Sequence, residues 1–154
     1  MSRPEEGSQS PRVRQLVLLR HGQTEYNATR RMQGQLDTDL SELGRQQALA
    51  VADAIARFDP LAVVSSDLRR AYDTATALGD RIGLPVAIDT RLRETHLGEW
   101  QGLTHTEVDA VAPGARSAWR ADATWAPPGG ENRIDVARRS MAVVGELLDK
   151  YENW

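Results

Sequence analysis

Three short apolar runs, each bounded by polar residues, predict buried strands. They cover residues 16–19, 61–64 and 86–88. The first run, Leu16-Val17-Leu18-Leu19, has four apolar residues in a row, which is typical of a strand that is buried on both faces of a parallel sheet.

Apolar residues at helical spacing predict helices between these strands. One helix begins after Ser41, a candidate N-cap, and stops before Pro60. Another covers about residues 68–82 and is closed by Gly83. Because strands and helices alternate, we expect an α/β fold, a three-layer sandwich in which helices cover both faces of a mostly parallel sheet with right-handed crossovers.

The C-terminal third of the chain adds helices but no further strand. The chain becomes helical again from Thr104, and residues 113–130 predict an excursion over one face of the sheet. The last predicted helix has an apolar stripe at 4-3-4-3 spacing, made of Ala137, Met141, Val144, Leu148 and Tyr151. Such a helix normally leads back to another strand, so the pattern predicts that a C-terminal part of the domain is absent here.

Length and composition limit the class of protein. The 154 residues allow one domain, which we place at residues 15–154, after a disordered tail at residues 1–14 that lacks the apolar core of a signal peptide. A net charge of −3 argues against a nucleic-acid-binding surface, and no apolar run approaches the length of a membrane span. The chain has no cysteine, which excludes disulfides and thiolate chemistry and fits a cytoplasmic location.

Charged residues follow the first predicted strand directly, as Arg20-His21-Gly22. Ligands of open α/β sheets bind at the carboxyl ends of the strands, and a glycine there lets backbone N–H groups approach an anion. One interpretation is a phosphate pocket with His21 at its floor. The alternative is a strand that ends in a solvated Arg-His pair.

Two further segments carry candidate chemistry. Arg69 and Arg70 lie in the first turn of a helix, where the dipole disfavours cations unless an anion binds at the same end. Their spacing allows only one of them to face such a site. Glu94 lies near the end of the third strand, and a carboxyl group beside a bound phosphate suits general acid catalysis.

Together these segments resemble the histidine phosphatase superfamily, the phosphoglycerate mutase-like proteins. Four boxes stand in the family's order, at residues 20–24, 65–71, 92–102 and 129–131, and the resemblance spans residues 15 to about 150. Two departures stand out. Asn132 replaces the serine of the last box, and no histidine follows His105, although the family has a second catalytic histidine near its C-terminal end.

The resemblance implies roles for residues at the matching positions. His21 would be the phosphoryl acceptor, Arg20 and Arg70 would hold the phosphate, and Glu94 would donate the proton, which leaves Arg69 solvated. The resemblance further implies four substrate-binding residues: Gly22, Thr24, Asn27 and Gln33. No cofactor and no metal are implied, and His96 and His105 lack the spacing of a helical two-histidine metal site.

The implied function is that of a metal-independent phosphomonoester hydrolase that acts on a small phosphorylated substrate through a phosphohistidine intermediate. Residues 32–38, 94–98 and 122–127, in loops expected at the pocket rim, resemble those of members that act on glucosyl-3-phosphoglycerate. A broad-specificity phosphatase or a mutase of the same superfamily remains an alternative. So does a non-catalytic phosphate-binding domain, if the chain ends at Trp154. We expect no nucleic-acid or membrane partner, and the sequence leaves a homodimer open.

Overall fold

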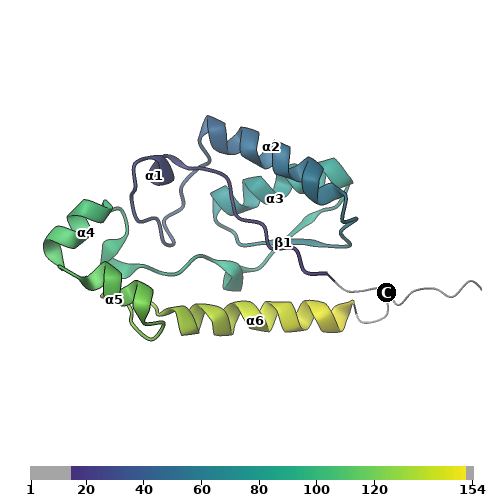
Figure 1. The fold of residues 1–154 in the computed structure, drawn as a ribbon. Coiled ribbons are helices and arrows are strands. Elements are labelled where there is room, and N and C mark those ends of the chain that lie inside the picture. The colour runs from purple at the N-terminus through teal and green to yellow at the C-terminus, as the bar shows by residue number, and fades with distance from the viewer. Residues whose placement is uncertain (1–14, 152–154) are drawn as a thin grey trace, which may run out of the picture.

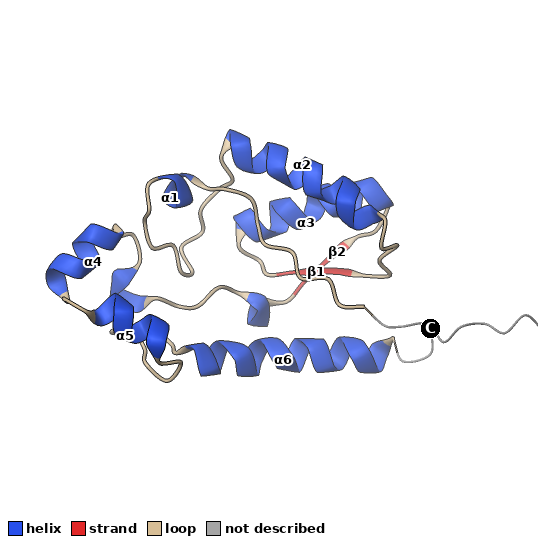
Figure 2. Ribbon diagram, in the orientation of Figure 1, coloured by secondary structure: helices blue, strands red, loops and turns tan. Residues whose placement is uncertain are grey.

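The computed structural model describes residues 15–151, so the predicted tail at residues 1–14 lies outside the described residues. The chain forms three layers, with α2 and α3 on one face of a small parallel sheet and α6 on the other (Figures 1 and 2). The main elements are α2 (Glu42–Ala56), β1 (Val63–Ser65), α3 (Arg69–Ile82), β2 (Val86–Ile88) and α6 (Arg133–Lys150). Strands β1 and β2 pair in parallel, with Val63 opposite Val86. The predicted α/β fold class is confirmed.

Helices α2 and α3 begin and end where the sequence predicts. The Ser41 side chain accepts a hydrogen bond from the N–H of Gly44 and caps α2. Gly83 ends α3 with a positive φ of 72°, a conformation that glycine adopts without steric cost. Between these helices and β1 lies the first hydrophobic cluster, whose buried members are Ala52, Ile55, Val63, Ala75 and Leu78.

The predicted strand at residues 16–19 is not formed. Leu18 is 83% exposed and Leu16 is 55% exposed, and neither pairs with a strand among the described residues. A strand exists only as part of a ladder, and no ladder hydrogen bonds join this run to β1 among the described residues. Together with β1 and α6, this run lines an apolar cavity of about 460 Å³.

The 3₁₀ turn η1 (Thr90–Leu92) directly follows β2 and packs against α6. The remaining elements gather at the end of the molecule away from β1 and β2 (Figure 1). They are α1 (Glu25–Ala28), the 3₁₀ turn η2 (Gly98–Trp100), α4 (His105–Val111) and α5 (Ala115–Ala121). A second hydrophobic cluster of Met32, Leu97, Trp100 and Val108 lies here, with Trp119 and Trp125 packed against it. The segment at residues 113–130 therefore packs into this cluster and on α4, and the expectation that it crosses a face of the sheet is wrong.

Helix α6 confirms the predicted last helix, and Val144, Leu148 and Tyr151 of its predicted apolar stripe line the cavity beside β1. Val143 is buried, whereas Met141 is 62% exposed and Leu148 is 44% exposed. Polar contacts add to this packing, because Arg139 and Glu146 both bond to the segment around η1. Among the described residues, no helix has the length and apolar character needed to cross a bilayer.

Candidate active site

His21 is half-buried, and its ring orientation is set by the backbone. Its Nδ1 lies 2.6 Å from the carbonyl oxygen of Gly22. Only an N–H group makes such a contact favourable, so Nδ1 carries the proton and Nε2 presents a lone pair. Burial lowers the pKa of His21 below 6.5, and the charges of Arg70 and Arg20 lower it further against the opposing effects of the Gly22 hydrogen bond and Glu94. The ring is therefore neutral at neutral pH and nucleophilic at Nε2.

Gly22 holds this turn against α2 and α3. Its N–H donates to Thr74 Oγ1 at 3.1 Å. A Cβ atom at this position would collide with the carbonyl oxygen of Gly44, so the turn and α2 approach closely because both positions are glycine.

Thr24 organises two amide side chains. It has no exposed surface, and its Oγ1 donates to Gln33 Oε1 at 2.6 Å while its backbone N–H donates to Asn27 Oδ1 at 3.0 Å. Thr38 Oγ1 also donates to Gln33 Oε1 at 2.6 Å. Because both amide oxygens are engaged, the side-chain NH₂ groups of Asn27 and Gln33 remain as donors toward the pocket that these residues line.

Arg70 is buried and Arg69 is exposed, as the predicted helix register requires. Arg70 as a whole residue is 1% exposed. Its guanidinium donates to the carbonyl oxygens of Gly34 and Leu36, each at 2.6 Å. Burial lowers its pKa, while the neighbouring Glu94 opposes this effect. Arg69 instead pairs with Asp37 and Asp39 at 3.5 Å, and its side chain is 63% exposed. Arg70 therefore brings positive charge near His21 and holds the loop that carries Gln33.

Arg20 is exposed, and none of the described residues bonds to its guanidinium. Its charge reaches His21, whose pKa it lowers.

The backbone around Glu94 is held by Arg139 of α6. Nη1 of Arg139 donates to the carbonyl oxygens of Arg91 at 2.7 Å and Arg93 at 2.6 Å. Nη2 donates to the carbonyl oxygen of Glu94 at 3.0 Å and to Glu131 Oε1 at 2.6 Å. The carboxylate of Glu94 accepts only from the N–H of Thr95 among the described residues, at 2.9 Å, and is exposed to the pocket.

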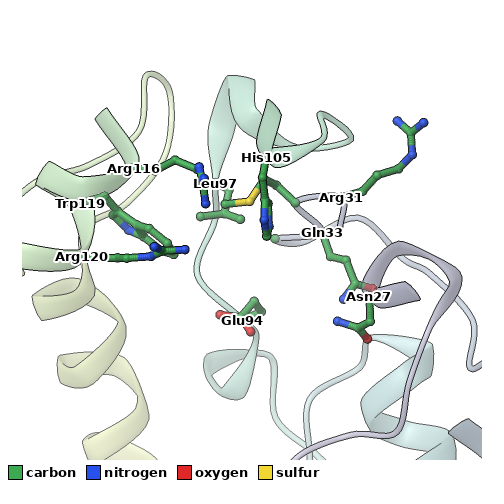
Figure 3. A pocket seen from close by; sticks show the side chains of 11 residues that line it. Asn27, Arg31, Gln33, Glu94, Leu97, His105, Arg116, Trp119 and Arg120 are labelled. Atoms are coloured by element: carbon green, nitrogen blue, oxygen red, sulfur yellow. The ribbon is translucent and has the colours of Figure 1, made fainter. Parts of the chain in front are cut away.

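Figure 3 shows the pocket, of about 220 Å³, into which Glu94 projects from one side and Asn27 and Gln33 from another. Its opposite wall consists of His105, Arg116, Trp119 and Arg120, which the sequence interpretation did not select. The four-residue spacing of Arg116 and Arg120, which puts both side chains on one face of a helix, was the feature of the sequence that could have indicated this wall. His21 and Arg70 are not among the residues that line this pocket. His21 lines the larger apolar cavity instead, and Glu94 is near enough to influence the pKa of both residues.

The described residues offer few ligands for a metal ion. Between residues 15 and 151, no group of three or more histidine, aspartate and glutamate side chains converges on one point. The groups that the described residues bring together here are a neutral histidine, arginines, amides and one carboxylate.

Comparison with known proteins identifies the class to which this fold and site belong. Residues 16–154 match the family model described as the histidine phosphatase superfamily (branch 1). The chain belongs to this family.

Individual relatives are similar over most of the chain. A glucosyl-3-phosphoglycerate phosphatase of Mycolicibacterium vanbaalenii is 71% identical over 143 residues, which cover 93% of this chain. A mycobacterial glucosyl-3-phosphoglycerate phosphatase solved with VO₃ has a TM-score of 0.85 at 66% identity, over 87% of this chain and 67% of that one. Bacillus stearothermophilus YhfR has a TM-score of 0.81 at 36% identity, over 87% of this chain and 67% of that one.

The chain spans 64% of the length of the Mycolicibacterium vanbaalenii relative and 64% of its counterpart in Mycobacterium tuberculosis. The C-terminal part of these relatives lies beyond the match.

Proposed function

We propose that this chain hydrolyses a phosphomonoester through a phosphohistidine on His21, without a metal ion, and that the substrate is glucosyl-3-phosphoglycerate. The observation that carries the proposal is the state of His21, a neutral ring whose Nε2 has no hydrogen-bond partner among the described residues, with the Glu94 carboxylate near enough to influence its pKa. Glu94 in turn lines a pocket together with the amides of Asn27 and Gln33. A nucleophile, an acid and donors for phosphate oxygens are the parts that covalent phosphoryl transfer needs.

In the first half-reaction, His21 Nε2 attacks the phosphorus atom in line with the ester oxygen. The N–P bond forms as the P–O bond breaks, and Glu94 in its protonated form gives its proton to the leaving alkoxide. In the second half-reaction, water attacks the phosphohistidine while the Glu94 carboxylate takes a proton from it. Phosphate leaves, and both residues return to their starting states.

Positive charge and amide donors stabilise the phosphoryl oxygens as charge spreads over them. Asn27 and Gln33 donate through their NH₂ groups, and Arg20 and Arg70 supply charge near His21. Thr24 and Gly22 contribute by position, since Thr24 fixes both amides and Gly22 sets the turn that carries His21.

Similarity over the pocket loops supports the substrate assignment. The relatives named as glucosyl-3-phosphoglycerate phosphatases are 66–71% identical over 143 residues that include these loops. Metal independence is consistent with an Arabidopsis thaliana relative, 39% identical over 144 residues, that is named a metal-independent phosphoserine phosphatase. We also expect a cytoplasmic location and no nucleic-acid or membrane partner, given a net charge of −3 and no cysteine.

The test is phosphate release from glucosyl-3-phosphoglycerate and from simple monoesters in the presence of chelator, using the protein at its natural full length. H21A should abolish both turnover and acid-labile labelling by substrate phosphate. The matched control is H96N, because Asn can replace the His96 Nδ1 atom that accepts from the N–H of Gly98. Acid-labile label that persists in H21A, or activity that requires added magnesium, would overturn the proposal. Isomerisation of a phosphoglycerate without release of phosphate would favour a mutase.

A further inference from the structure

One forked ion pair joins the two segments that carry Glu94 and Arg70. Arg93 directly precedes Glu94 in the sequence, and Asp67 lies in the turn between β1 and α3. Arg93 Nε donates to Asp67 Oδ1 at 2.7 Å, and its Nη2 donates to Asp67 Oδ2. The pair therefore connects the stretch that carries Glu94 to the turn that leads into Arg70.

This pair is partly shielded from water and stays ionised. The side chains of Arg93 and Asp67 are 34% and 31% exposed. The hydrogen bonds from Arg93 lower the pKa of the Asp67 carboxyl below its usual value, and burial opposes this effect only in part. A guanidinium that meets a carboxylate in two hydrogen bonds fixes the orientation of the two groups as well as their distance. The pair can therefore hold the two segments in one arrangement.

The other contacts of the Glu94 backbone come from elsewhere in the fold. Arg139 of α6 donates to the carbonyl oxygens at residues 91, 93 and 94. Gln35, in the loop that follows α1, donates through Nε2 to the carbonyl oxygen of Glu94 at 3.2 Å. Among the hydrogen bonds and ion pairs of residues 15–151, only the Arg93–Asp67 pair ties this stretch by a side chain to the turn before α3.

The distance between Glu94 and His21 depends on how this stretch is held. Glu94 is near enough to raise the pKa of His21 against the effect of burial. Its carboxylate accepts only from the N–H of Thr95 among the described residues, so the backbone sets its place. Figure 3 shows this side chain projecting into the pocket from one side. A shift of the backbone away from α3 would carry the carboxylate away from His21.

We propose that Arg93 is a positioning residue, which through Asp67 holds the Glu94 carboxyl group where it can protonate the leaving group. This inference rests on the proposed function, in which Glu94 is the proton donor. Displacement of a reacting group by about 1 Å can slow a reaction about 100-fold. Loss of the pair should therefore impair proton transfer, although every group that takes part in the reaction is still present.

The first measurement is the rate of phosphohistidine formation, by rapid quench, on the protein at its natural full length. R93M keeps an apolar stem but removes the charge and the fork. It should slow formation from glucosyl-3-phosphoglycerate by about 10- to 100-fold and from nitrophenyl phosphate by about twofold or less, because a nitrophenolate leaves without a proton. R93K should recover part of the loss, because it returns the charge but not the fork. D67N/R93M should lose no more than R93M alone, because the two side chains act as one unit.

The second measurement does not depend on turnover. If Glu94 withdraws from His21 in R93M, the midpoint of the NMR titration of the His21 Cε1 proton should fall, because a nearby carboxylate raises the pKa of a histidine. The midpoint should move toward its value in E94Q. R93M/E94Q should titrate like E94Q alone, because Arg93 acts on His21 through Glu94.

R91M is the matched control. Arg91 lies two residues before Arg93 and makes a comparable forked pair, but with Glu146 of α6, at 2.8 and 2.6 Å. R91M should leave both the ratio of the two rates and the His21 midpoint as in the wild type.

Equal slowing of the two substrates in R93M, with an unchanged His21 midpoint, would refute the positioning role and leave the phosphatase proposal standing. An R91M variant that behaves like R93M would refute it as well. If the His21 midpoint falls in R93M as in E94Q but the wild type forms no phosphohistidine from either substrate, Arg93 positions Glu94 and the proposed phosphatase function fails.

Discussion

At the scale of single residues, the protonation of His21 decides whether the site has a nucleophile. Burial, Arg70 and Arg20 lower its pKa below 6.5, so the neutral ring persists to lower pH than in an unfolded chain. An NMR titration of the His21 Cε1 proton should have its midpoint below 6.5. H21N identifies the resonance by its disappearance.

The same shift predicts a pH dependence of stability. The unfolded chain takes up a proton near pH 6.5 while the folded chain resists it, so the contribution of His21 to stability is present above 6.5 and is lost as pH falls through the lower folded pKa. The free energy of unfolding should fall less steeply between pH 7 and 5 in H21N than in the wild type. A His21 midpoint at or above 6.5 would contradict the assignment of a neutral, desolvated nucleophile.

Arg70 and Arg69 provide a paired comparison within one turn of α3. R70M removes a buried charge near His21 and one donor from each of the carbonyl oxygens of Gly34 and Leu36, so we expect a loss of about 3 kcal/mol in transition-state stabilisation and a further loss of folding stability. R69M removes exposed ion pairs and should change either quantity by less than about 0.5 kcal/mol. Measured values of kcat/KM and urea midpoints check this. Equal effects of the two substitutions would mean that the register of α3 is wrong.

At the scale of elements, α6 is connected to the Glu94 segment by Arg139. Its five hydrogen bonds to the segment around residues 91–94 and to Glu131 make Arg139 a positioning residue for Glu94, the proposed proton donor. R139M should therefore slow phosphohistidine formation from a sugar-phosphoglycerate by about 10-fold or more, and from a nitrophenyl phosphate much less, because a nitrophenolate leaves without a proton.

R138M is the control, since Arg138 is the exposed neighbour on the same helix. E94Q gives the reference value, because it removes the proton that Glu94 would donate to the leaving group. Rapid-quench measurement gives the rate of phosphohistidine formation from each of the two substrates. If R139M slows both leaving groups by the same factor, Arg139 maintains the fold of the site without positioning the acid.

Elements that depend on local chemistry were predictable from the sequence. The start of α2 at Ser41 and the end of α3 at Gly83 follow from cap residues that act within one turn. The sequence wrongly predicted a strand at residues 16–19, because a strand needs a hydrogen-bonded partner that its own sequence does not specify. The apolar stripe of α6 was predicted in part, since Val144, Leu148 and Tyr151 line the cavity beside β1 whereas Met141 is 62% exposed.

Some residues of the candidate site were likewise predictable from the sequence, and others were not. His21, Arg70 and Glu94 were found because each adjoins a recognisable box, and the structure places them near one another. The Arg93–Asp67 pair was missed because its members lie 26 residues apart, and pairing is a property of the folded chain.

At the scale of the whole molecule, the apolar run at residues 16–19 borders the large cavity and is partly exposed. L18Q should change the free energy of unfolding of the 154-residue chain by less than about 0.5 kcal/mol, because Leu18 is 83% exposed. L78A, in the first hydrophobic cluster, should cost about 2–5 kcal/mol. Urea denaturation of both variants measures the difference. A loss in L18Q as large as that in L78A would show that this run is covered in solution.

The two hydrophobic clusters support different parts of the candidate site. His21 and Arg70 are attached to the first cluster through α2 and α3, whereas Arg116, Trp119 and Arg120 belong to the wall supported by the second. Glu94 lies on the connecting stretch, within reach of both. Substitutions around Trp100 and Trp125 can therefore reshape the face that meets the substrate while the nucleophile keeps its surroundings. Under the proposed function, the reacting groups and the wall of the pocket are therefore supported by different cores, and a change in one core leaves the other in place.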